Sequence, residues 1–113
     1  MIGVTKKFFI NEMTLEVEIA KNFFSRLRGL MFRKKLEAGR GLLLAPCDGV
    51  HMFFMRFAID VVYLDKNFYI KKIVRSLPPW LGVSFCFGAW AALELPAGEA
   101  EHLKLEVGQK FQT

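Results

Sequence analysis

The alternation of apolar and polar positions predicts mostly β structure in this chain. In the segment LEVEI at 15–19, apolar residues alternate with glutamates, which is the period-two pattern of a half-buried strand. The apolar run KFFI at 7–10 precedes it, and Asn11 and Glu12 lie between the two runs as turn residues. Residues 5–20 therefore predict a β-hairpin whose second strand turns Leu15, Val17 and Ile19 toward the core.

A helical pattern follows the hairpin. Asn22 is a plausible N-cap, and the apolar residues after it recur at helical spacing. From residue 41 onward, short apolar runs alternate with turn signals, and we expect strands at 41–45, 51–55, 59–64, 68–74, 83–87 and 90–95. The last two runs are apolar on both faces, so at least one should be a central strand. Residues 99–103 fit one helical turn, and 105–111 fit a closing turn with a short strand.

These elements predict a single α+β domain over residues 1–113. We expect a mainly antiparallel curled sheet, or a small β-barrel, with one main helix packed on it. The length of 113 residues and the 53% content of hydrophobic residues suit one compact core. The same composition excludes a disordered tail, and two cysteines exclude a disulfide-dense scaffold.

Twelve phenylalanines exceed the two tryptophans and two tyrosines several-fold. Because phenylalanine has no polar group, any cluster of exposed rings would mark an interface with a ligand, with a protein partner or with a second copy in a homodimer. The uncharged stretch 76–93 is long enough for a membrane span. Pro78, Pro79 and three interrupting small residues predict short strands there instead. The N-terminal residues lack a secretory pattern, so we expect a cytoplasmic protein with its cysteines as thiols.

The net charge of +5 is concentrated in residues 21–75, which hold twelve bases and four acids. Arg26, Arg28 and Arg33 lie on or just after the predicted helix, together with Lys34, Lys35 and Arg40. They would form an anion- or RNA-binding face or, more plainly, a solvated helix face. The chain has no nucleic-acid motif, and its rings do not alternate with its bases as a stacking platform requires. Nucleic acid is therefore a disfavoured partner, and anion or RNA binding through this face is kept as a second alternative.

The most unusual stretch, APCDGVHMFFMRFAID at 45–60, embeds polar side chains in apolar surroundings. Buried polar groups need partners, so they would pair with each other or face a cleft. The leading hypothesis is non-enzymatic binding of a small ligand or a partner segment in a polar groove rimmed by phenylalanine and methionine, without a cofactor. The predicted ligand-binding residues are His51, Phe54, Met55, Arg56, Asp60 and Glu94.

Two chemical alternatives use the same stretch. Cys47 activated by His51, with Asp60 as the orienting group, would form a small thiol or hydrolase-type enzyme. A metal site would use Cys47 and His51 with His102 or Cys86, but the spacing lacks the paired pattern of strong metal motifs, and we expect no metal. In the plainest interpretation Cys47 is a small buried hydrophobe and His51 a satisfied residue at a strand edge, while Glu94 faces outward.

Five motifs in order carry a resemblance to a known family. They are RGLMFR at 28–33, GLLL at 41–44, FMR at 54–56 leading into IDVVYLD at 59–65, LELPAG at 93–98 and VG at 107–108. From about residue 14 onward the chain resembles the family called domain of unknown function 192. Residues 47–60 are similar to its branch reading C-x-x-I-H-T-F-F-M-R-F-P-I-D. The resemblance implies a compact β-rich domain with one main helix, and it implies no established activity, substrate or catalytic residue.

Overall fold

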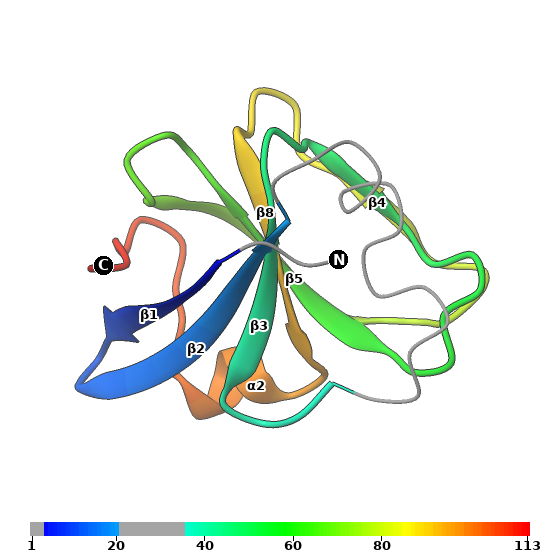
Figure 1. Cartoon of the computed structure of the whole chain (residues 1–113). Helices are drawn as coiled ribbons and strands as arrows, with labels where there is room; N and C mark the ends of the chain where they lie inside the picture. Colours follow the sequence, from blue (N-terminus) through cyan, green and yellow to red (C-terminus); the bar gives the residue numbers. More distant parts are fainter. Residues whose placement is uncertain (1–3, 21–35) are drawn as a thin grey trace.

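A computed structural model describes residues 4–20 and 36–113, and their backbone is mainly β-strand (Figure 1). The strands are β1 (Thr5–Ile10), β2 (Met13–Ala20), β3 (Arg40–Leu44), β4 (Gly49–His51), β5 (Ile59–Leu64), β6 (Ile70–Leu77), β7 (Val83–Phe85) and β8 (Ala91–Pro96). A short helix, α2 (Glu99–His102), follows β8. Six strands form one sheet in the order β1-β2-β3-β8-β5-β6, and β4 pairs with β7 in a separate two-stranded ribbon.

The N-terminal hairpin is confirmed. β1 and β2 pair antiparallel, and Asn11 and Glu12 make the turn with left-handed backbone angles (φ 50° and 64°). The side-chain amide of Asn11 donates hydrogen bonds to the carbonyls of Leu103 and Lys104, each at 2.9 Å. This turn therefore also ties the hairpin to the C-terminal part of the chain.

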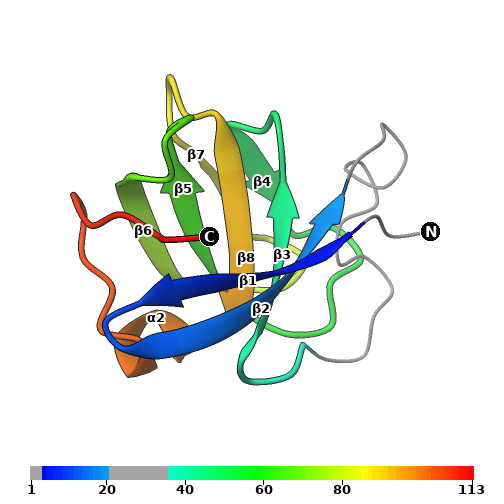
Figure 2. The same cartoon turned by 60° about the vertical axis from the view of Figure 1, so that its left-hand side comes forward.

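The sheet is curled but open, so the alternative of a small β-barrel is wrong. β2 and β3 are parallel and the other neighbouring strands are antiparallel. The edge strands β1 and β6 do not pair with each other. Instead the C-terminal segment forms single bridges next to both edges, Phe9 to Gln112 and Tyr69 to Lys110. Figure 2 shows the β1–β2 hairpin lying across the front of β8.

Alternating residues of the central strands enter two apolar clusters, one on each face of the sheet. Leu43, Val62 and Leu93 join the first cluster, with the hairpin, α2 and the C-terminal segment. Leu42 and Tyr63 join the second, with residues from β4 and the loop after it. β8 is the central strand expected from its two apolar faces. The one-turn α2 agrees with the helical turn expected at 99–103, whereas the main helix expected after Asn22 lies outside the described residues.

Candidate functional site

The β4–β7 ribbon has one face against the sheet and one face in solvent. Val50 of β4 is buried, and the opposite residue, Ser84 of β7, points the same way. His51 and Val83 form the neighbouring cross-strand pair, whose side chains point outward and are exposed. Because side chains alternate along a strand, Phe85 shares that outward face, and it is 68% exposed. The ribbon thus presents apolar side chains to water where a sheet face would normally be covered.

The strand expected at His51–Met55 is wrong beyond His51, because the chain turns there. Met52 N donates to Gly82 O at 2.9 Å and Trp80 N donates to Met52 O at 2.8 Å, so the loop after β4 is pinned to the turn before β7. The Met55 amide donates back to the Met52 carbonyl at 3.1 Å and closes the turn. Met52 and Met55 are consequently buried, while the two phenylalanines between them are exposed.

Two exposed aromatic residues on these turns have left-handed backbone angles. Phe54 has φ 66° and Trp80 has φ 65°, and their rings meet edge to face with centroids 5.1 Å apart. Bulky side chains rarely adopt this conformation, which costs on the order of 1 kcal/mol or more per residue. Such backbone geometry is concentrated at binding and catalytic sites.

Seven exposed apolar residues lie on the ribbon and on the turns that flank it, and we call them together the β4–β7 surface. Leu81 is 87% exposed and Phe87 is 97% exposed, so these side chains make almost no contact with the rest of the chain. The members of the surface are Phe53, Phe54, Trp80, Leu81, Val83, Phe85 and Phe87. A soluble domain seldom leaves this many large apolar side chains together in water unless something covers them.

Three basic side chains lie near the β4–β7 surface. Lys72 of β6 donates from Nζ to the carbonyl of Phe85 at 2.8 Å. The Nζ atom of Lys71 lies beside Gly88, 3.9 Å from where a Cβ atom would stand. Arg56 is exposed in the loop that carries Phe53 and Phe54. The surface is therefore apolar in its middle and positively charged at its margin.

Tyr63 fastens the ribbon to the central sheet. Its ring is buried in the second cluster, and its hydroxyl lies 2.6 Å from Ser84 Oγ on β7. Burial raises the pKa of Tyr63 to about 12; the hydrogen bond to Ser84 opposes this rise, and the neighbouring Cys47, Cys86 and Glu94 add to it. The neutral phenol is thus the form that the fold favours.

We expect the folded protein to lose stability in alkaline solution through this phenol. The pKa of Tyr63 is higher in the folded state than its ordinary value of 10.0. The neutral phenol therefore contributes fully to the free energy of unfolding below pH 10, and this contribution is lost as the pH rises toward 12. Urea unfolding of the wild type and of Tyr63→Phe across this range measures the effect. The free energy of unfolding should fall more steeply for the wild type, and equal slopes would contradict the prediction.

In the part of the chain that the structure describes, the six predicted ligand residues do not all lie on one face of the sheet. His51, Phe54 and Arg56 are exposed on or beside the β4–β7 surface, whereas Met55 is buried beneath it. His51 accepts a hydrogen bond at Nδ1 from the Phe53 amide at 3.3 Å, and the two rings are 5.2 Å apart. A depression of about 370 Å³, lined by 65–67 and 88–90, contains none of the six residues.

Asp60 and Glu94 lie on opposite faces of the sheet. Asp60 is buried on the side of the first cluster, and its carboxylate accepts hydrogen bonds from the backbone amides of Ser76 (2.8 Å), Gly98 (3.1 Å) and Ala100 (2.9 Å). Glu94 stands opposite Val61 and is buried on the side of the second cluster, so the outward orientation expected for it is wrong. The structure thus gives Asp60 a structural role in holding the turn before α2.

Each residue of the proposed thiol centre has a hydrogen bond to a backbone group. The Cys47 thiol donates to the Gly49 carbonyl at 3.1 Å, and His51 and Asp60 accept from backbone amides as described above. Both cysteines are thiols, partly buried against the second cluster. Among residues 4–20 and 36–113, no three His, Cys, Asp or Glu side chains gather closely enough to hold a metal ion.

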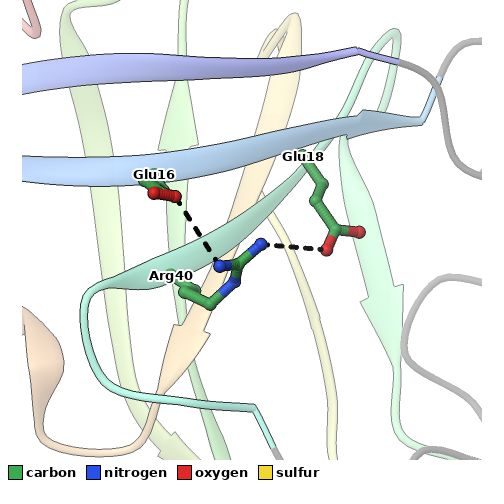
Figure 3. Close-up of polar contacts among 3 residues, drawn as sticks. All are labelled: Glu16, Glu18 and Arg40. Atoms are coloured by element: carbon green, nitrogen blue, oxygen red, sulfur yellow. Dashed lines mark ion pairs between the residues drawn. The ribbon is translucent and has the colours of Figure 1, made fainter.

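Arg40 is the part of the predicted basic face that the structure describes. Its guanidinium forms ion pairs with Glu16 at 3.6 Å and Glu18 at 3.8 Å on β2 (Figure 3). This arginine therefore joins β3 to its parallel neighbour. The candidates Arg26, Arg28 and Arg33 lie outside the described residues, and their proposed anion binding stays a prediction.

Sequence reasoning missed the apolar residues of β7 and its flanking turns. In the run 83–87, Ser84 and Cys86 alternate with Val83, Phe85 and Phe87, which is a period-two signal. The expectation that this run is apolar on both faces overlooks this alternation. The excess of phenylalanine was the other available signal, and it indicated an interface without locating it.

Comparisons with known proteins identify close relatives of the whole described fold. The family model DUF192, described as "Uncharacterized ACR", matches residues 6–113. A UPF0127 protein of Pyrococcus furiosus is 36% identical over 119 residues, covering 99% of this chain and 96% of that protein. A UPF0127 protein of Pyrococcus horikoshii is 36% identical over 102 residues, covering 86% of each chain.

Two solved crystal structures share the fold. A protein of unknown function from Novosphingobium aromaticivorans has a TM-score of 0.83 at 21% identity, over 99% of this chain and 85% of that one. A protein of Sinorhizobium meliloti, described as a putative transcription regulator, has a TM-score of 0.84 at 20% identity, over 94% of this chain and 89% of that one. At these identities the similarity establishes the fold alone.

Proposed function

Because this chain belongs to the DUF192 family, whose description names no activity, we propose from its own surface that it is a non-enzymatic binding domain and binds through the β4–β7 surface. In this proposal it acts in the cytoplasm and needs no cofactor. The observation that carries the proposal is the group of seven large apolar side chains exposed on the β4–β7 ribbon and its flanking turns. His51 and Arg56, predicted as ligand residues, supply polar contacts at its margin.

Energetics support binding at this surface. Transferring a valine, leucine or phenylalanine side chain fully out of water is worth about 1.5–3 kcal/mol, so covering several of them would supply the main driving force. The left-handed Phe54 and Trp80 are held in place by the hydrogen bonds of Met52 beneath them. A surface fixed in advance loses less conformational entropy when a partner binds.

The enzyme alternative has less support. Its three candidates, Cys47, His51 and Asp60, each have a hydrogen bond to a backbone group. The Asp60 carboxylate also lies far from Cys47. It binds the Ala100 amide of α2 on the face of the first cluster, whereas Cys47 packs against the second cluster on the opposite face. A general base must reach the proton of the nucleophile directly or through one water, and a third group must orient that base. Binding therefore accounts for the geometry better than catalysis does.

A site-specific photocrosslinker tests the proposal in the cells that make the protein. Phe85 is replaced with p-benzoylphenylalanine, and the matched control carries the same replacement at Phe9, an exposed phenylalanine on the edge strand β1. Irradiation should give a discrete adduct with a protein or a lipid at position 85 only. The adduct should disappear when Phe54 and Trp80 are also changed to serine. Equal adducts at both positions, no adduct at position 85, or an adduct that survives the serine changes would contradict the proposal.

A further inference from the structure

We infer that the partner of the β4–β7 surface is the interfacial region of an anionic lipid bilayer. The inference rests on the proposed function and names its partner. The first argument is shape: Leu81 and Phe87 are 87% and 97% exposed, so they project from the molecule instead of lining a groove. Peptide-binding domains usually offer a groove or pocket to the peptide. A bilayer interface instead accepts projecting apolar side chains without a complementary shape.

The second argument is the kind of side chain and its position. Aromatic and leucine side chains occupy the boundary between headgroups and acyl chains when a protein lies on a membrane, and tryptophan favours that depth. Here Trp80 and Leu81 lie on the turn before β7, and Phe87 follows β7 at its other end. Phe85 lies between them on the outward face of the ribbon. Apolar contacts are therefore spread along the ribbon, as a protein lying flat on a membrane requires.

The third argument is charge complementarity. All five bases between residues 46 and 90 are exposed, while Asp48 is the one exposed acid in that range, Asp60 being buried and Asp65 half-buried. Lys71 and Lys72 lie against the end of the ribbon, as described above. Anionic headgroups attract such bases at about 1 kcal/mol each. A second copy of this chain would place the same positive margins against each other, which disfavours a homodimer through this surface.

The fourth argument is that the surface is held rigidly. The Tyr63 hydroxyl contacts Ser84 Oγ at 2.6 Å, and the buried Val50, Met52 and Met55 pack under the ribbon in the second cluster. The apolar side chains therefore cannot fold inward to leave water. Insertion into a bilayer removes them from water without any rearrangement of the sheet.

Fluorescence of Trp80 in the presence of vesicles tests the inference. The chain has two tryptophans, so Trp90→Phe leaves Trp80 as the reporter and preserves an aromatic ring next to Phe68. Vesicles of phosphatidylcholine with phosphatidylserine should shift the Trp80 emission to shorter wavelength, and raised salt should weaken the binding. Vesicles of phosphatidylcholine alone should bind less well.

Variants in the same background identify the contacts. Phe85→Asp should reduce vesicle binding roughly tenfold or more, because it removes a large apolar contact and adds a repelled charge. Lys71→Gln should reduce binding to the anionic vesicles about fivefold, which corresponds to the attraction of one base. Phe9→Asp, on the opposite edge strand, should leave binding unchanged. Circular dichroism verifies that each variant is folded. If Phe85→Asp does not fold, the loss of vesicle binding in Lys71→Gln still tests the inference.

Several outcomes would overturn the inference. They are an unshifted Trp80 emission with both vesicle types, equal binding to both types, or a shift that Phe85→Asp leaves intact. Reversible dimerisation that buries Trp80, or tighter binding to single-stranded RNA than to anionic vesicles, would also overturn it. A protein adduct at position 85 without vesicle binding would reject the lipid and preserve the proposed function. Absence of both an adduct and vesicle binding would reject both.

Discussion

Replacing Asp60 with alanine should lower the free energy of unfolding by about 4 kcal/mol, the largest effect expected of any single substitution considered for this protein. The carboxylate accepts hydrogen bonds from three backbone amides at 2.8–3.1 Å: Ser76 near the end of β6, Gly98 just before α2 and Ala100 in α2. Removing it leaves these donors without partners, and each buried unpaired donor costs about 1–3 kcal/mol. Urea unfolding measures the loss as a lower midpoint at an unchanged denaturant slope.

Asp65→Ala is the matched control for this prediction. Asp65 also accepts two backbone amides, from Asn67 at 2.8 Å and Tyr69 at 3.1 Å, but in an exposed turn where water can replace it. Its loss should cost about 1 kcal/mol. Asp60→Asn keeps the shape and one acceptor oxygen and should fall between the two alanine variants. If Asp60→Ala and Asp65→Ala were equally stable, the three amides would not depend on the buried carboxylate.

Gly82→Ala should lower the free energy of unfolding by about 3 kcal/mol, because no space exists for a methyl group. A Cβ atom at this position would lie 2.5 Å from the Pro78 carbonyl oxygen and 2.8 Å from side-chain carbons of Leu77 and Met52. The carbonyl belongs to the backbone of the same turn and receives the Gly82 amide at 3.1 Å. The turn must therefore open to admit the methyl group, and urea unfolding should show the loss directly.

Gly49→Ala provides the comparison within the same ribbon. Its Cβ atom would meet Phe85 Cβ at 3.4 Å and the Ser84 carbonyl oxygen at 3.5 Å, which are ordinary contacts. The cost should stay below about 1 kcal/mol, since alanine also stiffens the unfolded chain. If Gly82→Ala and Gly49→Ala lowered the free energy of unfolding equally, steric crowding at Gly82 would not be the cause of the loss.

The regular strands of this fold could be predicted from sequence where one pattern dominated. The alternation at 15–19 identified β2, and the continuous apolar run at 59–64 identified β5, all of whose residues are buried. The pairing of the C-terminal segment with the edges of the open sheet could not be predicted in the same way. Gln112 bridges to Phe9 of β1 and Lys110 bridges to Tyr69 beside β6, and this pairing leaves no periodic signal.

The candidate site was only partly predictable for a related reason. Polar residues inside an apolar run indicate that partners must exist, and for Asp60 these partners are backbone amides. The pattern could not show on which face of the sheet each residue lies. The left-handed turn at Phe54 changes the alternation after His51, so Met52 and Met55 are buried together. Faces assigned by alternation fail wherever such a turn intervenes.

The position of β8 has a consequence for how the protein is made. It is the last strand along the chain, yet it lies between β3 and β5 at the centre of the sheet. During synthesis, β3 and β5 have no partner on the side where β8 will pair until residue 96 has left the ribosome. Until then the β1-β2-β3 unit and the β5–β6 pair are separate, each with an unpaired strand edge. A nascent chain paused before that point should depend on chaperones, whereas one extended beyond residue 112 can complete both edges of the sheet.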